Sequence, residues 1–440
     1  MAVTPFDSAM MRGLFGDDDI ARLFSDSAEV RAMLLVEGAL AQAQGELGVI
    51  PSDSAAFIKR AVMEVQIDPA GLFAETGVNA VVVPALVKAF RAATEAPEHT
   101  QYFHWGATSQ DIMDTALVLR LKQVLALFEV RLQAIIKALG TLAEAHADLP
   151  MAGRTYGQIA SPTTFGALVA TWGMPLIDHL QRLIELRPRL LRISLFGAAG
   201  TASQLQHAPD LRRKMAETLG LEPTDTPWHS TRDSIAEYAG WLALVTGSLG
   251  KMGEDLLLLT QSGIAEVSLG GGGSSSTMPQ KSNPVLPSLL VALARQVTAL
   301  NGAIQGAQFH RQQRDGAAWF VEWMNLGQIT MATGRALTAA GELSGNITPD
   351  PDRMLAHIED GLGLIYAEAL SFELAKTLPR PNAQAEVKAL CQQVRTDATP
   401  LPDLARAKWP DIPASLFAPQ TQLGEAPAQA SAFVKAAKAY

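Results

Sequence analysis

The longest apolar stripe in the sequence, from Asp114 to Ala147, constrains the fold more than any other feature. Apolar side chains recur there at steps of three and four residues, at Leu117, Leu121, Val124, Phe128, Leu132, Ile135, Leu139 and Leu142. This spacing puts them on one face of an α-helix. At about 1.5 Å per residue the helix would be roughly 50 Å long. Because so long a helix needs neighbours along its whole apolar face, the stripe predicts a helix bundle.

Four further segments show the helical pattern and predict four more long helices. They cover about 162–189, 234–264, 284–308 and 316–344. The second of them is apolar on nearly all sides, as expected for a helix that several neighbours bury. Strand-like segments are short, at 80–86 and 191–196, and the first contains Pro84, which strand interiors rarely accept. The sequence therefore predicts an all-α fold.

Turn-forming residues divide the predicted helices into three regions. Shorter helical segments interrupted by prolines precede Ile112, and the turn cluster ITPDPD follows Asn346. We expect an N-terminal helical domain (1–112), a central long-helix bundle (113–346) and a C-terminal helical domain (347–440). The proline-rich tail from Pro410 onward is expected to be loosely structured.

Composition limits the classes of function. The chain has 440 residues, of which 48% are hydrophobic and 18% charged, so it can bury a large core. A net charge of −9 argues against non-specific nucleic-acid binding but leaves room for a few cations around a small anionic ligand. The single cysteine, Cys391, excludes an intramolecular disulfide and argues against a cysteine-based metal site.

The N-terminal segment lacks the basic and then apolar order of a signal peptide. No uninterrupted apolar run reaches about 18 residues, the length that a membrane-spanning helix needs. We therefore expect a cytoplasmic protein without a membrane span.

Five polar segments lie beside the ends of the predicted long helices. They are HWGATSQD (104–111), GRTYGQIASPTTFG (153–166), WHSTRD (228–233), GGGGSSSTMPQKSNP (270–284) and HRQQRD (310–315). Each alone has a simpler explanation: helix capping for Thr108 and Asp111, hydrogen-bonded structural histidines for His104 and His229, and a flexible linker for the Gly-Ser run. Because a bundle brings helix ends together, their joint occurrence favours a binding or catalytic site.

The segment SSTMPQKSNP (275–284) resembles the signature loop GSSxMPxKxNP of the fumarase/aspartase superfamily. HWGATSQDIMDT and GRTYGQIASPTTFG resemble the other two conserved regions of this superfamily, in the expected order. WHSTRD resembles a fourth element of its adenylosuccinate-lyase branch. The chain is therefore identified as a member, and it is most similar over nearly its whole length to the branch of bacterial carboxymuconate cycloisomerases.

This resemblance implies a homotetramer in which five-helix bundles from four subunits form a twenty-helix core. Each active site would combine three regions from three different subunits, with neither a cofactor nor a metal. The implied reaction is the lactonization of 3-carboxy-cis,cis-muconate in protocatechuate catabolism (the β-ketoadipate pathway). The implied partner is an anionic di- or tricarboxylate, with no role for a nucleic acid or a membrane.

The motif match also implies the site residues. Ser275 takes the position of the catalytic serine, and N–H groups of the glycine run at 270–273 could stabilise its alkoxide. Lys281 and His104 are the other expected catalytic residues. The expected substrate contacts are Thr108, Ser109, Gln110, Arg154, Thr155, Tyr156, Gln158, His229, Arg232, Ser276, Met278, Asn283 and Arg314. Their cations, hydroxyls and amides suit a substrate with three carboxylates.

Two residues depart from the superfamily pattern. Tyr156 stands where fumarases and related lyases have the histidine of GRTHxQ, which belongs to their proton-transfer apparatus. An aromatic residue at this position resembles the cycloisomerases and argues against an ordinary C–N or C–O lyase. Ser274 replaces a glycine of the signature, which leaves the catalytic serine open among residues 274–276; counting back from Met278 favours Ser275.

Three alternatives stay open. The chain could be a lyase of the adenylosuccinate or argininosuccinate type that releases fumarate. It could be a cycloisomerase for a sulfonate-bearing muconate, which the same cations would accept. It could also be a non-catalytic structural relative, although Ser275, Lys281 and Asn283 are all retained.

Overall fold

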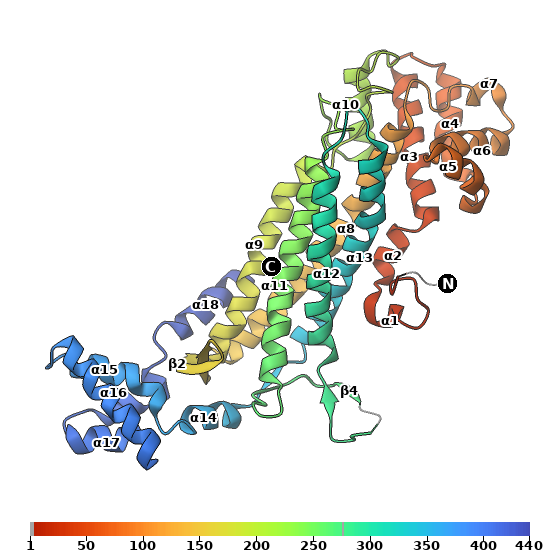
Figure 1. The fold of residues 1–440 in the computed structure, drawn as a ribbon. Coiled ribbons are helices and arrows are strands. Elements are labelled where there is room, and N and C mark those ends of the chain that lie inside the picture. The colour runs from red at the N-terminus through yellow and green to blue at the C-terminus, as the bar shows by residue number, and fades with distance from the viewer. Residues whose placement is uncertain (1–3, 275–276) are drawn as a thin grey trace. The chain divides into compact units, whose positions relative to one another are not determined.

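The computed structural model describes residues 4–274 and 277–440, and most of them are helical (Figure 1). The five long helices are α8 (Ser109–Ala145), α9 (Phe165–Leu190), α11 (Asp233–Leu259), α12 (Val285–Ala307) and α13 (Gly316–Ser344). They lie close to the ranges expected from apolar periodicity. The prediction of an all-α fold is confirmed.

Shorter helices precede and follow the long ones. Before α8 come α1 (Arg12–Phe15), α2 (Asp18–Leu23), α3 (Asp26–Glu46), α4 (Ser52–Glu64), α5 (Phe73–Asn79), α6 (Val83–Thr94) and α7 (Pro97–Thr100). The others are α10 (Ala208–Leu219), α14 (Pro351–Glu359), α15 (Ala367–Leu374), α16 (Arg380–Asp397), α17 (Leu401–Lys408) and α18 (Ala426–Ala437). The strand-like segment at 80–86 in fact leads into α6. Pro84 lies in the first turn of that helix, where a missing N–H group is tolerated.

Three pairs of short antiparallel strands accompany the helices: β1 (Pro150–Thr155) with β2 (Gln158–Thr164), β3 (Val267–Ser268) with β6 (Thr348–Pro349), and β4 (Gly273–Ser274) with β5 (Ser282–Asn283). The hairpin of β1 and β2 was not expected from the sequence. Its two turn residues, Tyr156 and Gly157, both have positive φ angles, of 51° and 72°, as a type I′ turn requires. The turn was missed because tyrosine is an unusual residue at such a position.

The chain divides into two compact units, and each of the five long helices contributes to both. Unit 1 consists of Met1–Val130, His179–Gly247 and Leu293–Thr338. Unit 2 consists of Arg131–Asp178, Ser248–Ala292 and Ala339–Tyr440.

Aromatic side chains connect the long helices in unit 1. The rings of Phe128 on α8 and Trp241 on α11 lie 6.3 Å apart between centroids. Trp241 Nε1 donates a hydrogen bond to the carbonyl oxygen of His179 on α9, at 3.0 Å. The hydroxyl groups of Tyr238 on α11 and Thr330 on α13 are also 3.0 Å apart. These polar atoms are buried but hydrogen-bonded, so they cost little in the apolar core.

Small residues allow helices to approach closely in unit 2. A Cβ atom added at Gly253 on α11 would lie 2.8 Å from the carbonyl oxygen of Pro287 on α12. One added at Gly173 on α9 would lie only 2.0 Å from Cζ of Phe433 on α18. The fully buried Phe433 ring anchors α18, so the expectation of a loosely structured tail is wrong for this segment. Pro427 lies in the first turn of α18 and does not interrupt it, because proline fits the first helical turn.

Helix α12 is long and apolar enough, by length and composition alone, to cross a membrane, an outcome not expected from the sequence. Its contacts are those of a bundle helix. Besides the Gly253 contact in unit 2, Gln305 Nε2 in unit 1 donates a hydrogen bond to the carbonyl oxygen of Ala236 on α11, at 2.8 Å. An apolar composition is also typical of a helix that other helices surround.

The Gly173–Phe433 contact predicts the effect of adding one methyl group. We expect Gly173→Ala to lower the free energy of unfolding by about 1–3 kcal/mol, because the new Cβ displaces the Phe433 ring. Urea unfolding at a fixed protein concentration measures this change. Gly302→Ala on α12 is the matched control, because no heavy atom of the described chain outside its own stretch of helix lies within 4 Å of its added Cβ. The control should gain up to about 1 kcal/mol of helix propensity. A Gly173→Ala protein as stable as the wild type would contradict the close packing.

Candidate active site

Asp111, in the first turn of α8, organises the polar segments of unit 1. Its carboxylate is fully buried. Oδ1 accepts hydrogen bonds from the Phe196 backbone N–H at 2.8 Å and from His229 Nε2 at 2.9 Å. Oδ2 accepts from the backbone N–H groups of Gly197 at 2.9 Å and Thr108 at 3.0 Å. The Asp111 carboxylate thus caps α8, as the helix-capping interpretation of the sequence predicted. It also binds the loop at 196–197 and His229, both far from it along the chain. Because a carboxylate only accepts, His229 carries a proton on Nε2.

Arg314, in the loop before α13, lies against the start of α8. Its Nε donates to Gln110 Oε1 at 2.7 Å, and its Nη2 lies 3.4 Å from Thr108 Oγ1. Gln110 Nε2 in turn donates to the carbonyl oxygen of His229 at 2.9 Å. The predicted site residues brought together here are Thr108, Ser109, Gln110, His229 and Arg314. A helix N-terminus carries partial positive charge, and with an exposed guanidinium beside it this arrangement can bind a carboxylate.

His104 is fixed by a buried acid. It has a positive φ angle of 66°, and its Nδ1 lies 2.6 Å from Oε1 of Glu37 on α3. Burial by itself would lower the pKa of His104, but the charge and hydrogen bond of Glu37 outweigh it, so the pKa is raised above its ordinary value. The imidazole is still 20% exposed. His104 can therefore present a positive charge or a proton to an anionic ligand.

Arg232 has a different environment from the one predicted. Its guanidinium is buried and bound to two carboxylates. It donates to Asp114 on α8 at 2.8 and 3.0 Å and to Glu322 on α13 at 2.9 and 2.6 Å. It also lies over the Trp228 ring, 4.8 Å from the centroid. Arg232 is therefore better explained as an ion pair within the fold of unit 1 than as the predicted contact with substrate.

In unit 2, Arg154 on β1 is likewise paired. Its Nη1 and Nη2 donate to Oε2 and Oε1 of Glu266, at 2.9 and 2.7 Å. Glu266 is fully buried, and its Oε1 also accepts from Nδ1 of His357 on α14 at 2.7 Å. Neither Glu266 nor His357 was expected from the sequence, because neither belongs to a polar motif. The one feature of the sequence that could have indicated a role for Glu266 is its position shortly before the glycine run.

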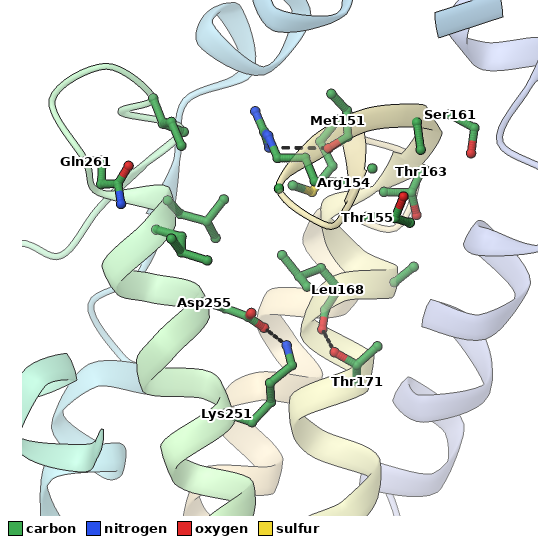
Figure 2. Close-up of a pocket in the computed structure, with 18 of the residues that line it drawn as sticks. Met151, Arg154, Thr155, Ser161, Thr163, Leu168, Thr171, Lys251, Asp255 and Gln261 are labelled. Carbon is green, nitrogen blue, oxygen red and sulfur yellow. Dashed lines mark hydrogen bonds and ion pairs between the residues drawn. The ribbon is translucent and has the colours of Figure 1, made fainter. Parts of the chain in front are cut away.

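The β1–β2 hairpin, α9 and α11 enclose a cavity of about 620 Å³ within unit 2 (Figure 2). Arg154 and Thr155 line it from the hairpin. Lys251 and Asp255, which form an ion pair on α11, line it from another side. Tyr156, at the hairpin turn, is fully exposed in the single chain. Its neighbour Gln158 is also exposed.

The signature loop forms a short hairpin in which β4 and β5 pair Gly273 with Asn283. The Lys281 side chain is exposed, and its backbone N–H donates to the carbonyl oxygen of Met278 at 3.0 Å. The predicted serines at 275–276 lie outside the described residues, so their roles stay predictions. Across 4–274 and 277–440, no group of three or more His, Cys, Asp or Glu side chains is arranged to hold a metal ion.

Neighbouring side chains leave no room for a Cβ atom at two glycines of this loop. A Cβ added at Gly272 would lie 2.0 Å from Ser282 Oγ, and one at Gly273 would lie 2.7 Å from Val285 Cγ2. Gly270 has a φ angle of 67°, which side chains other than glycine rarely adopt. A flexible linker would not need glycine at these three positions, so the linker interpretation does not account for Gly270, Gly272 and Gly273.

Comparisons with known proteins show which proteins this chain resembles. The model of a family described as Lyase matches residues 13–299. The 3-carboxy-cis,cis-muconate cycloisomerase of Pseudomonas aeruginosa is 39% identical over 377 residues, which cover 84% of this chain and 82% of that protein. The crystal structure of the 3-carboxy-cis,cis-muconate lactonizing enzyme from Pseudomonas putida matches with a TM-score of 0.91 and 33% identity, over 98% of this chain and 99% of that one. A nitrosuccinate lyase of Streptomyces davaonensis is 33% identical, over 96% of this chain and 93% of that protein.

The raised pKa of His104 predicts a pH-dependent contribution to stability. Because the folded pKa exceeds the ordinary value of 6.5, protonation of His104 stabilises the fold fully below that value. The contribution is lost as the pH rises through the folded pKa. We expect His104→Asn to cost more free energy of unfolding at about pH 5.5 than at about pH 9. Urea unfolding of both proteins at the two pH values measures the difference. Equal losses would show that Glu37 does not favour the charged imidazole.

Proposed function

The chain belongs to the lyase family of the fumarase/aspartase superfamily, and from this premise we propose that it lactonizes 3-carboxy-cis,cis-muconate. The observation that carries the proposal is the group of donors at the start of α8, where Arg314 lies beside Gln110 and Thr108. It is the kind of site that a polycarboxylate needs. The names of the Pseudomonas relatives and the presence of Tyr156 in place of a lyase histidine support this substrate.

The reaction needs little besides charge stabilisation and one proton. A carboxylate oxygen of the substrate adds to a diene carbon and forms the C–O bond of the lactone. The neighbouring carbon, which is next to another carboxylate, then accepts a proton. Between these steps negative charge spreads onto that carboxylate. The protein must therefore supply donors for the carboxylates and a group that transfers the proton.

The proposed roles rest on the motif match and are supported by the contacts of Arg314 with Gln110 and Thr108. Thr108, Ser109 and Gln110 bind one carboxylate at the helix N-terminus, with Arg314 as its cation. Lys281 and Asn283 bind another, as a point charge and an amide donor. Ser275 gives the proton in the lactone-forming direction and removes it in the reverse direction. Other residues of the second polar segment and of the signature loop shape the site: Thr155, Tyr156, Gln158, Ser276 and Met278.

We further propose a homotetramer with active sites shared between subunits. Exposed apolar side chains on two long helices support it, at Met174 and Ile184 on α9 and at Leu244 and Leu258 on α11. Such residues are typical of surfaces that pack against another protein. The fully exposed Tyr156 is explained if it contributes to a site completed by another copy of the chain. The cytoplasmic location stays a prediction.

Turnover of the substrate tests the proposed reaction. The purified protein should consume 3-carboxy-cis,cis-muconate without an added cofactor, seen as loss of diene absorbance, with the lactone identified by NMR. Ser275→Ala should lower kcat at least about 100-fold, because the proton-transfer group is removed. Ser274→Ala is the matched control and should keep most of the activity. If Ser274→Ala lost activity and Ser275→Ala kept it, the catalytic role would belong to Ser274. Absence of turnover by the wild type would refute the proposal.

A lyase is the second candidate, because the nitrosuccinate lyase covers nearly the whole chain. Nitrosuccinate, adenylosuccinate and argininosuccinate are therefore assayed in parallel, with fumarate as the product measured. A sulfonate-bearing muconate is included to define the ring-closing substrate. Fumarate release without muconate turnover would replace the proposed reaction. Failure to bind any di- or tricarboxylate would favour a non-catalytic relative.

Mixing two inactive variants tests the shared sites. Ser275→Ala removes a group from the signature loop, whereas Gln110→Ala alters the first polar segment. If each site takes these segments from different subunits, subunit exchange between the two proteins should restore intact sites. Random exchange would restore about a quarter of them. Activity that stays at the level of the separate variants, although mass spectrometry shows mixed tetramers, would mean that one subunit supplies both segments.

A further inference from the structure

Glu266 is a buried carboxylate that three N–H donors surround. Its side chain has no exposed surface, and the donors are the two terminal nitrogens of Arg154 and Nδ1 of His357, at 2.7 to 2.9 Å. An ionised carboxylate loses several kcal/mol of hydration on burial, and only close charge and hydrogen bonds offset that loss. Arg154 supplies the charge. The three side chains therefore form a mutually dependent group.

The backbone of Glu266 is fixed as firmly as its side chain. Its N–H donates to the carbonyl oxygen of Leu259, the last residue of α11, at 3.0 Å. Its carbonyl oxygen accepts from the N–H of Asp350, the N-cap residue of α14, at 2.8 Å. The next residue, Val267, begins β3 and pairs with Pro349. Glu266 thus joins α11 to α14 immediately before the chain enters the signature loop.

Through Arg154, Glu266 also binds a second segment, the β1–β2 hairpin. Arg154 lies on β1, close to the hairpin turn at Tyr156, and Glu266 holds its guanidinium in a two-bond, fork-like geometry. Nη1 also donates to the carbonyl oxygen of Ala152 on the same strand, at 3.3 Å. Because both terminal nitrogens are engaged, Arg154 is oriented toward Glu266 and serves the hairpin rather than a ligand.

We propose that Glu266, with Arg154 and His357, is a positioning residue that fixes the Tyr156 hairpin and the base of the signature loop in catalytic geometry. Glu266 touches no substrate and acts through the two segments that it holds. The catalytic consequence rests on the proposed function. The structural consequence does not, since it concerns the order of the two segments in the free protein.

Glu266→Gln tests the proposal with a side chain of nearly the same size. The amide has no charge, and its NH₂ group must face either Arg154 or His357, both of which are donors. Hydrogen exchange followed by mass spectrometry should show at least about tenfold faster exchange in peptides covering 150–164 and 267–274. Peptides from α16, elsewhere in unit 2, should be unchanged. Far-UV circular dichroism and elution volume confirm that the variant is folded.

Glu237→Gln is the matched control. Glu237 forms the same two-bond pair with Arg189, but on the exposed surface. The identical substitution should leave hydrogen exchange and activity unchanged, because exposed pairs contribute little. His357→Gln serves as a second variant that keeps the Arg154–Glu266 pair. It should accelerate exchange in the same two segments by a smaller factor.

Kinetics connect the group to catalysis. On 3-carboxy-cis,cis-muconate, Glu266→Gln should lower kcat/KM at least about tenfold, and Arg154→Gln by a similar factor. The double variant should be hardly worse than either single one, because both substitutions break the same interaction. Losses that multiply would overturn the proposal, as would unchanged exchange in both segments or a uniform rise over the whole chain. If the wild type does not turn over muconate, only the proposed function fails, and the exchange data still decide the positioning role.

Discussion

The polar segments of this protein are held by buried carboxylates, and each carboxylate in turn needs the N–H groups of those segments to offset its loss of water. Asp111 does this in unit 1, where it binds the start of α8, the turn at 196–197 and His229. Glu266 does it in unit 2, where it binds the β1–β2 hairpin and α14. An ionised carboxylate offers about four acceptor sites without a donor of its own, so it can gather several loops at one point.

Because buried carboxylates need compensating charge, the arginines of the polar motifs differ in what they bind. Arg154 and Arg232 each face carboxylates that the fold buries, and their charges are used to compensate them. Arg314 instead contacts neutral oxygens of Gln110, Thr108 and Ala198, and its side chain is exposed. Of these three arginines, Arg314 is therefore the one suited to an anionic ligand. In the proposed function, the remaining carboxylate binding then falls to the helix N-terminus, Lys281 and the N–H groups of the signature loop.

The sequence predicts the long helices well, because an apolar stripe with helical period leaves few other folds. It also locates the polar segments at helix ends. It does not predict the Glu266 group, whose partners lie 112 and 91 residues away along the chain. Arginine is rarely fully buried, so nothing in WHSTRD distinguishes Arg232 from a ligand contact. The prolines of the tail suggest loose structure, although Pro427 lies in the first turn of α18. The catalytic assignments come from the superfamily resemblance, because no spacing in the sequence alone identifies Ser275 as an acid or base.

In the proposed tetramer, one substrate is bound by the donors at the start of α8 of one subunit and by the signature loop of another, which Glu266 anchors. A crystal structure of the Ser275→Ala protein with 3-carboxy-cis,cis-muconate tests this mode of binding most directly. We expect one substrate carboxylate within hydrogen-bond distance of Arg314 and Thr108, another beside Lys281, and Arg154 still paired with Glu266. A ligand bound away from Arg314 and Lys281, or Arg154 released from Glu266 to bind it, would rule out this mode of substrate binding.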